Sequence, residues 1–166
     1  MVTSVTILGI DPGLRFTGWA VIEAAGSRLR YLASGRIAPS ADGSLAERLA
    51  ILSAALEDVV AARSPDEAAI EETFVNTNAR SALKLGQARG VCLLAPARAG
   101  IPVAEYAANV VKKAVVGVGH ADKTQVAAMI ARLVPTAPKV AHDEADAIAV
   151  AICHASHRRA PMGMTA

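Results

Sequence analysis

The sequence predicts an α/β fold in which one mixed β-sheet is covered by helices. Two observations predict it. The first forty residues hold three β-rich runs joined by short polar connections, a pattern typical of an antiparallel meander. The rest of the chain alternates between helical and strand patterns, as in sheets whose later strands are parallel. A length of 166 residues is typical of a single domain.

Five strands are expected, each bounded by turn residues or by the start of a helical pattern. The strands of the meander are predicted at Val5–Ile10, Thr17–Glu23 and Leu29–Ile37. Two shorter strands are predicted at Glu67–Glu71 and Pro102–Tyr106, each after a helical segment. We therefore expect a five-stranded mixed sheet, with the meander first and the parallel strands after it.

The helical segments begin after residue 44. Ser44 and Glu47 form a capping box, and apolar residues follow it at helical spacing as far as Pro65. Further helices are predicted at Asn78–Ala95, Asn109–Val116, Lys123–Leu133 and Asp143–Ser156, with Gly90 and Pro96 bending or ending the first of these. No periodicity follows Arg158, so we expect one domain over residues 1–157 and a mobile tail over residues 158–166.

Composition excludes several classes of protein. The apolar fraction is 53% and the net charge is +2, which is globular and too weakly basic to diagnose nucleic-acid binding by itself. Cys92 and Cys153 lie far apart in apolar segments, so we expect buried thiols in a reducing compartment and no zinc site. The sequence has no signal-peptide pattern and no apolar run of membrane-spanning length, and a cytoplasmic protein is expected.

Two carboxylates are predicted at one edge of the sheet. Asp11 ends the first strand, just before Pro12-Gly13, and Glu71 lies near the end of the fourth. If these strands are parallel neighbours, both residues lie at the carboxyl edge, where ligand sites of open α/β sheets occur. Glu72 then faces the opposite side of the sheet. Taken singly, Asp11 is also consistent with a turn residue, and Glu71 with an exposed strand end.

Two more carboxylates open the last helix. Asp143 and Asp146 are three residues apart and project on one side, which His142 shares, while Glu144 points elsewhere. Acids in a first helical turn also complement the helix dipole, which is the alternative explanation. Acids converging on one sheet edge would repel unless they held a hard divalent cation, and two such ions support phosphodiester cleavage. A metal site with Asp11 as a ligand is therefore predicted.

Five motifs resemble the RuvC family of bacterial Holliday junction resolvases. They are GIDPG at 9–13, AIE at 69–71, SALKLGQARG at 81–90, VVGVG at 115–119 and DEADAIA at 143–149. They follow one another in order and cover nearly the whole chain. The resemblance implies a ribonuclease H-like fold and a crossover junction endodeoxyribonuclease. Such an enzyme makes paired, metal-dependent incisions at four-way DNA junctions in recombination and repair.

The resemblance also implies roles for particular residues and partners. Asp11, Glu71, Asp143 and Asp146 resemble the catalytic and metal-binding acids, holding two Mg²⁺ or Mn²⁺ ions, with His142 as an alternative ligand. Phe74 matches a residue placed at the DNA crossover. The basic residues near the site are candidate DNA contacts, or ordinary charges of exposed helices: Arg80, Lys84, Arg89, Lys112, Lys113 and Lys123. A homodimer is implied, with the Asn78–Ala95 helix as a candidate interface, and RuvA and RuvB as partners.

Three alternatives stay open at the level of sequence. An actin- or sugar-kinase-like ATP-binding fragment would also begin with a strand ending in Asp-x-Gly, although such proteins need a second lobe that 166 residues do not supply. A related ribonuclease H-like nuclease would act on other nucleic acids. A junction-binding protein without catalysis would have no need of the intact acid set.

Overall fold

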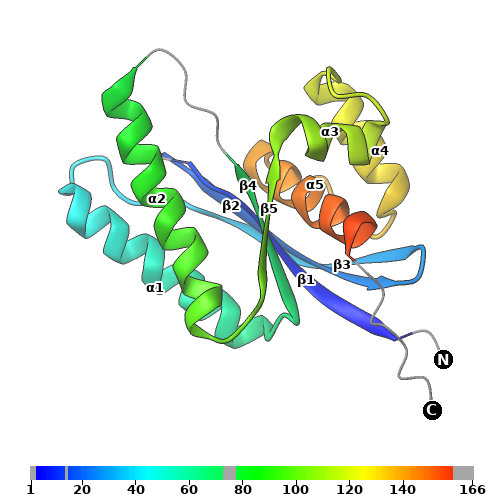
Figure 1. Cartoon of the computed structure of the whole chain (residues 1–166), viewed down its shortest axis with the longest axis horizontal. Helices are drawn as coiled ribbons and strands as arrows, with labels where there is room; N and C mark the ends of the chain where they lie inside the picture. The colour runs from blue at the N-terminus through cyan, green and yellow to red at the C-terminus, as the bar shows by residue number, and fades with distance from the viewer. Residues whose placement is uncertain (1–2, 14, 73–77, 159–166) are drawn as a thin grey trace.

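The computed structural model describes residues 3–13, 15–72 and 78–158, which form one sheet with helices on both faces (Figure 1). The sheet has five strands in the order β3-β2-β1-β4-β5. Its strands are β1 (Ser4–Asp11), β2 (Thr17–Ala25), β3 (Arg28–Ile37), β4 (Glu67–Glu72) and β5 (Val103–Ala107). All five lie within two residues of the ranges predicted from the sequence.

The pairing of the strands confirms the predicted mixed sheet. β1 pairs with β2, and β2 with β3, in antiparallel register, so the first three strands are a meander. β4 returns beside β1 in parallel register, and β5 adds to β4 in the same direction. The carboxyl ends of β1 and β4 therefore meet at one edge of the sheet.

The described residues form five helices. They are α1 (Leu45–Arg63), α2 (Ala79–Arg98), α3 (Ala108–Val116), α4 (Lys123–Leu133) and α5 (His142–His157). The predicted capping box begins α1, since Ser44 N–H donates to Glu47 Oε2 (2.6 Å) and Glu47 N–H donates to Ser44 Oγ (3.2 Å). α2 differs from its prediction because it passes Gly90 and Pro96 before ending. Pro96 lies in the last turn, and Gly100 adopts a left-handed φ of 77° just beyond it.

Two cores lie on opposite faces of the sheet. α1 and α2 cover one face, and α3, α4 and α5 cover the other (Figure 1). Successive side chains of β1 point into the two cores in turn: Ile7 packs toward α5, and Leu8 packs toward α1 and α2. Cys92 and Cys153 are buried free thiols, one in each core, as predicted. None of the helices in the described ranges is both long and apolar enough to span a membrane.

The backbone of α5 packs directly against the first two strands. Residues 147–154 of α5 are all buried. A side chain at Gly9 of β1 would clash with the Ala147 carbonyl oxygen and would lie 2.8 Å from the Ala151 nitrogen. A side chain at Gly18 of β2 would clash with the backbone of Asp143. Glycine at these two positions therefore lets the helix backbone rest directly on the strands.

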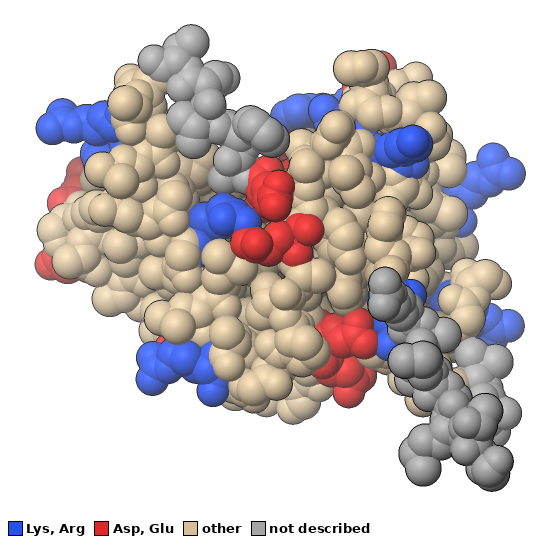
Figure 2. Space-filling model, viewed as in Figure 1, with Lys and Arg blue, Asp and Glu red and all other residues tan. Residues whose placement is uncertain are grey.

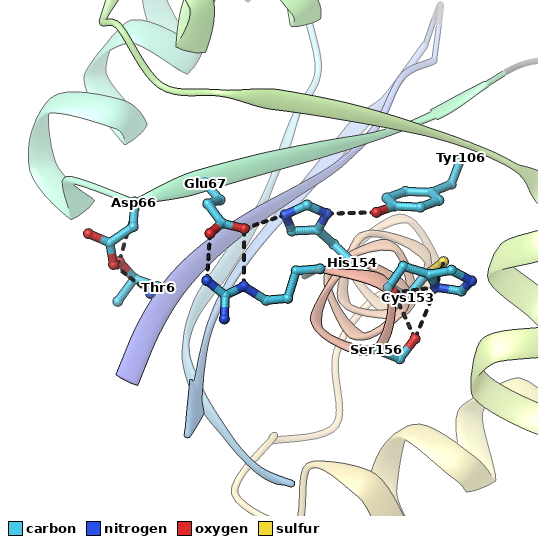
Figure 3. Close-up of polar contacts among 9 residues, drawn as sticks. Thr6, Asp66, Glu67, Tyr106, Cys153, His154 and Ser156 are labelled. Carbon is cyan, nitrogen blue, oxygen red and sulfur yellow. Dashed lines mark hydrogen bonds and ion pairs between the residues drawn. The ribbon is translucent and has the colours of Figure 1, made fainter. Parts of the chain in front are cut away.

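A chain of polar contacts joins the C-terminal end of α5 to β4 and β5 (Figure 3). The buried His154 has Nδ1 2.8 Å from the Tyr106 hydroxyl and Nε2 2.7 Å from Glu67 Oε2. Arg158 donates to both oxygens of Glu67, at 2.6 and 3.2 Å. Arg158, where the predicted tail begins, is thus in contact with the sheet. Residues 159–166 lie outside the described residues, and the division into domain and tail stays a prediction.

Gly9→Ala should destabilise the fold, because the added methyl group has no room between β1 and α5. We expect a loss of about 1–3 kcal/mol in the free energy of unfolding, measured by urea denaturation. Gly86→Ala is the matched control: nothing lies within 4 Å of that position on α2, and alanine favours a helix by about 0.5–1 kcal/mol. Equal effects of the two changes would contradict the tight contact.

Glu67→Gln should cost stability in a pH-dependent way. Hydrogen bonds from Arg158 and His154 lower the pKa of the Glu67 carboxyl below its usual value. Such a group stabilises the folded state above its unfolded pKa, and the contribution is lost as the pH falls through the lower folded pKa. We expect a loss of about 1–2 kcal/mol at neutral pH that shrinks below about pH 4, measured by urea denaturation across pH 3–8.

The control for this change is Glu57→Gln. Glu57 lies 3.7 Å from Arg98, and both side chains are largely exposed. Its removal should change stability by less than about 0.5 kcal/mol. A loss at Glu67 that did not vary with pH would show that the charge of the carboxylate is not what stabilises the fold.

Candidate active site

The structure brings Asp11 and Glu71 together at the end of β1 and β4. Ile10 pairs with Ile70 in the parallel register, so the two acids come next on neighbouring strands. Their carboxyl groups are within hydrogen-bonding distance of each other. Strand alternation turns Glu72 to the other face. Asp11 is therefore half of a carboxylate pair, as the strand pattern predicted.

Hydrogen bonds between Gly13 and Thr17 hold the turn after Asp11, and they were not predicted from the sequence. The Gly13 N–H donates to Thr17 Oγ1 (3.4 Å), and the Thr17 hydroxyl donates to the Gly13 carbonyl (3.3 Å). A side chain at Gly13 would clash with the Phe16 carbonyl oxygen. Thr17 is 1% exposed. A threonine at the start of an apolar strand was the only signal in the sequence for this contact.

The first two turns of α5 supply the other two acids, Asp143 and Asp146. Its backbone at Asp143 lies against Gly18, next to Asp11 in the sheet register. Glu144 points away from the acids, as predicted, and anchors the helix to β3. The Ser34 hydroxyl donates to Glu144 Oε1 (2.7 Å), and the Ala141 N–H donates to Oε2 (3.1 Å). Asp143 and Asp146 are thereby held close to the strand acids.

Burial and the neighbouring negative charges disfavour the ionised forms of Asp11, Glu71 and Asp146. Burial, the hydrogen bond with Glu71 and the charges of Asp146 and Asp143 raise the pKa of Asp11 to about 9. Burial also raises the pKa of Glu71 and that of Asp146. A cation that entered the site would relieve the repulsion and favour the ionised forms.

Basic groups already flank the acids. Lys112 and Lys123 line a cleft of about 210 Å³ together with Glu71 and Asp146. His142 Nδ1 lies 3.5 Å from Asp146 Oδ2. Over the face seen in Figure 2, acidic side chains lie at the centre with Lys and Arg on both sides. Acidic and basic side chains therefore share the lining of this cleft.

The carboxylates of Asp11 and Glu71 are suited to a divalent cation that needs few protein ligands. Among the described side chains, no three of Asp, Glu, His or Cys are grouped as a ready-made cage. Magnesium does not need one, because it keeps several waters and is commonly bound through one or two carboxylates. The hard oxygen donors of Asp11 and Glu71, raised in pKa by crowding and burial, suit such an ion. Asp143 and Asp146 lie near enough for their charges to raise the pKa of Asp11.

The other predicted DNA contacts lie in different settings. Arg80 and Lys84 are exposed on α2, and Lys113 is exposed on α3 beside Lys112. Arg89 instead forms an ion pair with Glu105 that joins α2 to β5. Phe74 lies outside the described residues.

A five-stranded mixed sheet of this order, with carboxylates at the ends of β1 and β4 and on the last helix, α5, defines the ribonuclease H-like class of fold. A family model described as Crossover junction endodeoxyribonuclease RuvC matches residues 7–154. The chain belongs to this RuvC family. The protein of that name from Acidiphilium cryptum is 62% identical over 151 residues, which are 91% of this chain and 90% of the relative. That from Allorhizobium ampelinum is 56% identical over 158 residues, covering 95% and 94%.

Solved structures agree with the family. T. thermophilus RuvC in complex with Holliday junction substrate superimposes with a TM-score of 0.83 and 33% identity, covering 91% of this chain and 93% of that one. The yeast mitochondrial Holliday junction resolvase Ydc2 superimposes with a TM-score of 0.64 at 12% identity, covering 90% and 77%. At that identity the second likeness supports the fold alone.

Asp11→Asn should stabilise the metal-free protein and abolish its response to magnesium. The amide removes a carboxyl that is disfavoured by burial and by three neighbouring acids. In EDTA near neutral pH we expect the melting temperature to rise by a few degrees, at about 2–4 °C per kcal/mol. Added Mg²⁺ should raise the melting temperature of the wild type and leave that of the variant unchanged.

The control is Asp58→Asn, on the exposed side of α1. It should leave both the EDTA melting temperature and the magnesium response at wild-type values. A variant at Asp11 that kept the full magnesium response would exclude Asp11 as a metal ligand.

Proposed function

We propose that this protein resolves four-way DNA junctions by metal-dependent hydrolysis of phosphodiester bonds at the site formed by Asp11, Glu71, Asp143 and Asp146. The observation that carries the proposal is the meeting of these acids at one sheet edge in a chain of the RuvC family. A relative with the same fold is described in complex with a Holliday junction substrate. The family match favours this activity over an ATP-binding fragment or a nuclease for other nucleic acids.

The metal supplies the chemistry that the side chains lack. Two Mg²⁺ or Mn²⁺ ions bound by the four acids would activate the attacking water and stabilise the leaving oxygen. The hydrogen-bonded pair of Asp11 and Glu71 is the proposed primary ligand set. Asp146 lines the same cleft, and Asp143 adjoins it. His142 contacts Asp146, so we assign it the role of orienting that carboxylate and keep Asp143 as the ligand.

Lysines of α3 and α4 are proposed to hold the scissile phosphate over the acids. Lys112 and Lys123 share the cleft with Glu71 and Asp146, and a bound phosphate there would meet two positive charges. Arg80, Lys84 and Lys113 are exposed and would extend contact with the DNA backbone. Phe74 is proposed to stack against bases at the opened crossover. Arg89 is the weakest of the predicted contacts because Glu105 already engages it.

A homodimer would present two such sites to the two strands to be cut. α2 exposes Leu83 (65%) and Leu94 (51%), which are eleven residues, or about three turns, apart and so share one face of the helix. Both side chains are large, apolar and accessible to another chain. We propose this face as the two-fold contact. RuvA and RuvB as partners stay predictions from the family resemblance, and the cytoplasm as location stays a prediction from the sequence.

The test is cleavage of a labelled four-way junction beside a linear duplex of the same sequence, with Mg²⁺, Mn²⁺ or EDTA. We expect paired nicks on the junction alone, with either metal and not with EDTA. Cleavage should be lost in Asp11→Asn while junction binding is retained. A protein that neither binds nor cuts junctions would overturn the proposal, and equal cutting of the duplex would point to a nuclease of another specificity.

Lys112→Ala should lower junction cleavage at least about tenfold, because Lys112 stands beside Glu71 and Asp146 in the cleft. Lys113→Ala is the matched control, since it removes the same charge from the next residue of α3, which does not line the cleft. Single-turnover cleavage rates at saturating protein would separate the two. Equal losses would mean that these lysines act only through general attraction for DNA.

A further inference from the structure

Arg36 lies on the side of the acids opposite the two lysines. Its guanidinium carbon is 4.1 Å from the centre of the Phe16 ring, and its Nη1 is 3.7 Å from Asp143 Oδ2. Arg15 approaches the same ring at 5.7 Å. Neither Arg36 nor Phe16 is part of the acid set or of the lysine cleft described above. The β1–β2 turn and β3 thus add a basic and aromatic cluster to the border of the site.

The sheet register places Arg36 in one row with Asp11. Asp11 of β1 pairs with Gly18 of β2, and Gly18 pairs with Arg36 of β3. Paired residues point to the same face, and two strand spacings separate Asp11 from Arg36 by about 10 Å. The residue between them has no side chain, and Asp143 fills that place. Asp143 therefore lies between a strand acid and an arginine.

The contacts of Arg36 differ in strength. At 3.7 Å its contact with Asp143 is an ion pair, too long for a good hydrogen bond, and the arginine side chain is 44% exposed. Such exposed pairs contribute little. The stack on Phe16 is at a distance typical of a cation–π contact and does not depend on the charge of Asp143. Arg36 would accordingly keep its place when Asp143 turned to a cation.

We infer that Arg36, positioned by Phe16, contacts a backbone phosphate of the bound DNA strand when a divalent cation occupies Asp143. The inference rests on the proposed function. Before metal binds, Arg36 serves as the counter-ion of Asp143. Once a bound cation neutralises the charge of Asp143, the guanidinium of Arg36 is free to bind a phosphate oxygen. Its planar N–H donors match the geometry of a phosphate group. Arg36 thereby extends the DNA-binding surface beyond the lysine side of the acids.

The first test is the salt dependence of junction binding, measured by fluorescence anisotropy with Ca²⁺ present and with EDTA. With Ca²⁺, Arg36→Gln should weaken binding about five- to tenfold and lower the slope of log affinity against log salt by about 0.9 for each lost phosphate contact. The loss should be smaller in EDTA, where Asp143 still holds the arginine. Phe16→Leu should give a partial loss. Denaturing gels of the same samples would confirm that the junction stays intact.

Arg30→Gln is the matched control. Arg30 lies on the same strand, is similarly exposed, and pairs with Glu23 at 3.0 Å, away from the acids. It should leave the salt slope at the wild-type value. If the slope of log affinity against log salt is the same for Arg36→Gln as for Arg30→Gln, the inference is wrong. If Arg36→Gln loses the same junction affinity in Ca²⁺ as in EDTA, the contact of Arg36 with phosphate is not coupled to Asp143.

The second test measures metal binding by titration calorimetry in the absence of DNA. Arg36→Gln removes the positive charge next to Asp143, so it should bind Mn²⁺ about two- to fivefold more tightly than the wild type. Arg30→Gln should bind Mn²⁺ with wild-type affinity. Unchanged affinity in Arg36→Gln would overturn the counter-ion role. If the wild type neither binds nor cuts junctions, the proposed function is wrong. If it does both while Arg36→Gln behaves as Arg30→Gln, the inference alone is wrong.

Discussion

The direct contact of the α5 backbone with β1 and β2 is the constraint on which the rest of the structure depends. Gly9 and Gly18 have no side chains, so the helix lies on the strands with nothing between. This contact buries residues 147–154 and places the first turn of the helix over the end of β1. Both the larger core and the assembly of the acid set follow from it. Core packing and the assembly of the acid set thus depend on the same contact.

The negative charges of the four acids are partly offset by basic side chains from α3, α4 and β3. Asp11 and Glu71 face each other at the sheet edge, and Asp143 and Asp146 add their charges from α5. Lysines of α3 and α4 border one side of the acids, and an arginine of β3 borders the other. Burial raises the pKa of Asp11, of Glu71 and of Asp146, and Glu71 and Asp146 line a cleft of about 210 Å³. This combination favours binding of metal over a fixed internal ion pair.

Local patterns in the sequence were sufficient for much of this architecture. The five strands and the Ser44 capping box each depend on residues close in sequence or on strand alternation, and they are present as predicted. The roles of the four acids stay predictions. Contacts between distant residues were not predictable in the same way. The pairs Arg36–Asp143 and Glu67–Arg158 join residues about a hundred positions apart, and no local spacing indicates them. The predicted end of the helix at Ala95 was too early, because a proline disturbs a helix less in its last turn, where Pro96 lies.

The order of the acids along the chain has a consequence for the life of the protein in the cell. Two of them lie in the first half of the sequence, but the other two come at residues 143 and 146, on the last helix. A chain still being synthesised, or one cut short before that helix, lacks half of the set and the packing that aligns the rest. The acid set that we propose to be catalytic is therefore complete only after the last helix has been synthesised. A fragment that ended before α5 would be unable to hydrolyse DNA by this route.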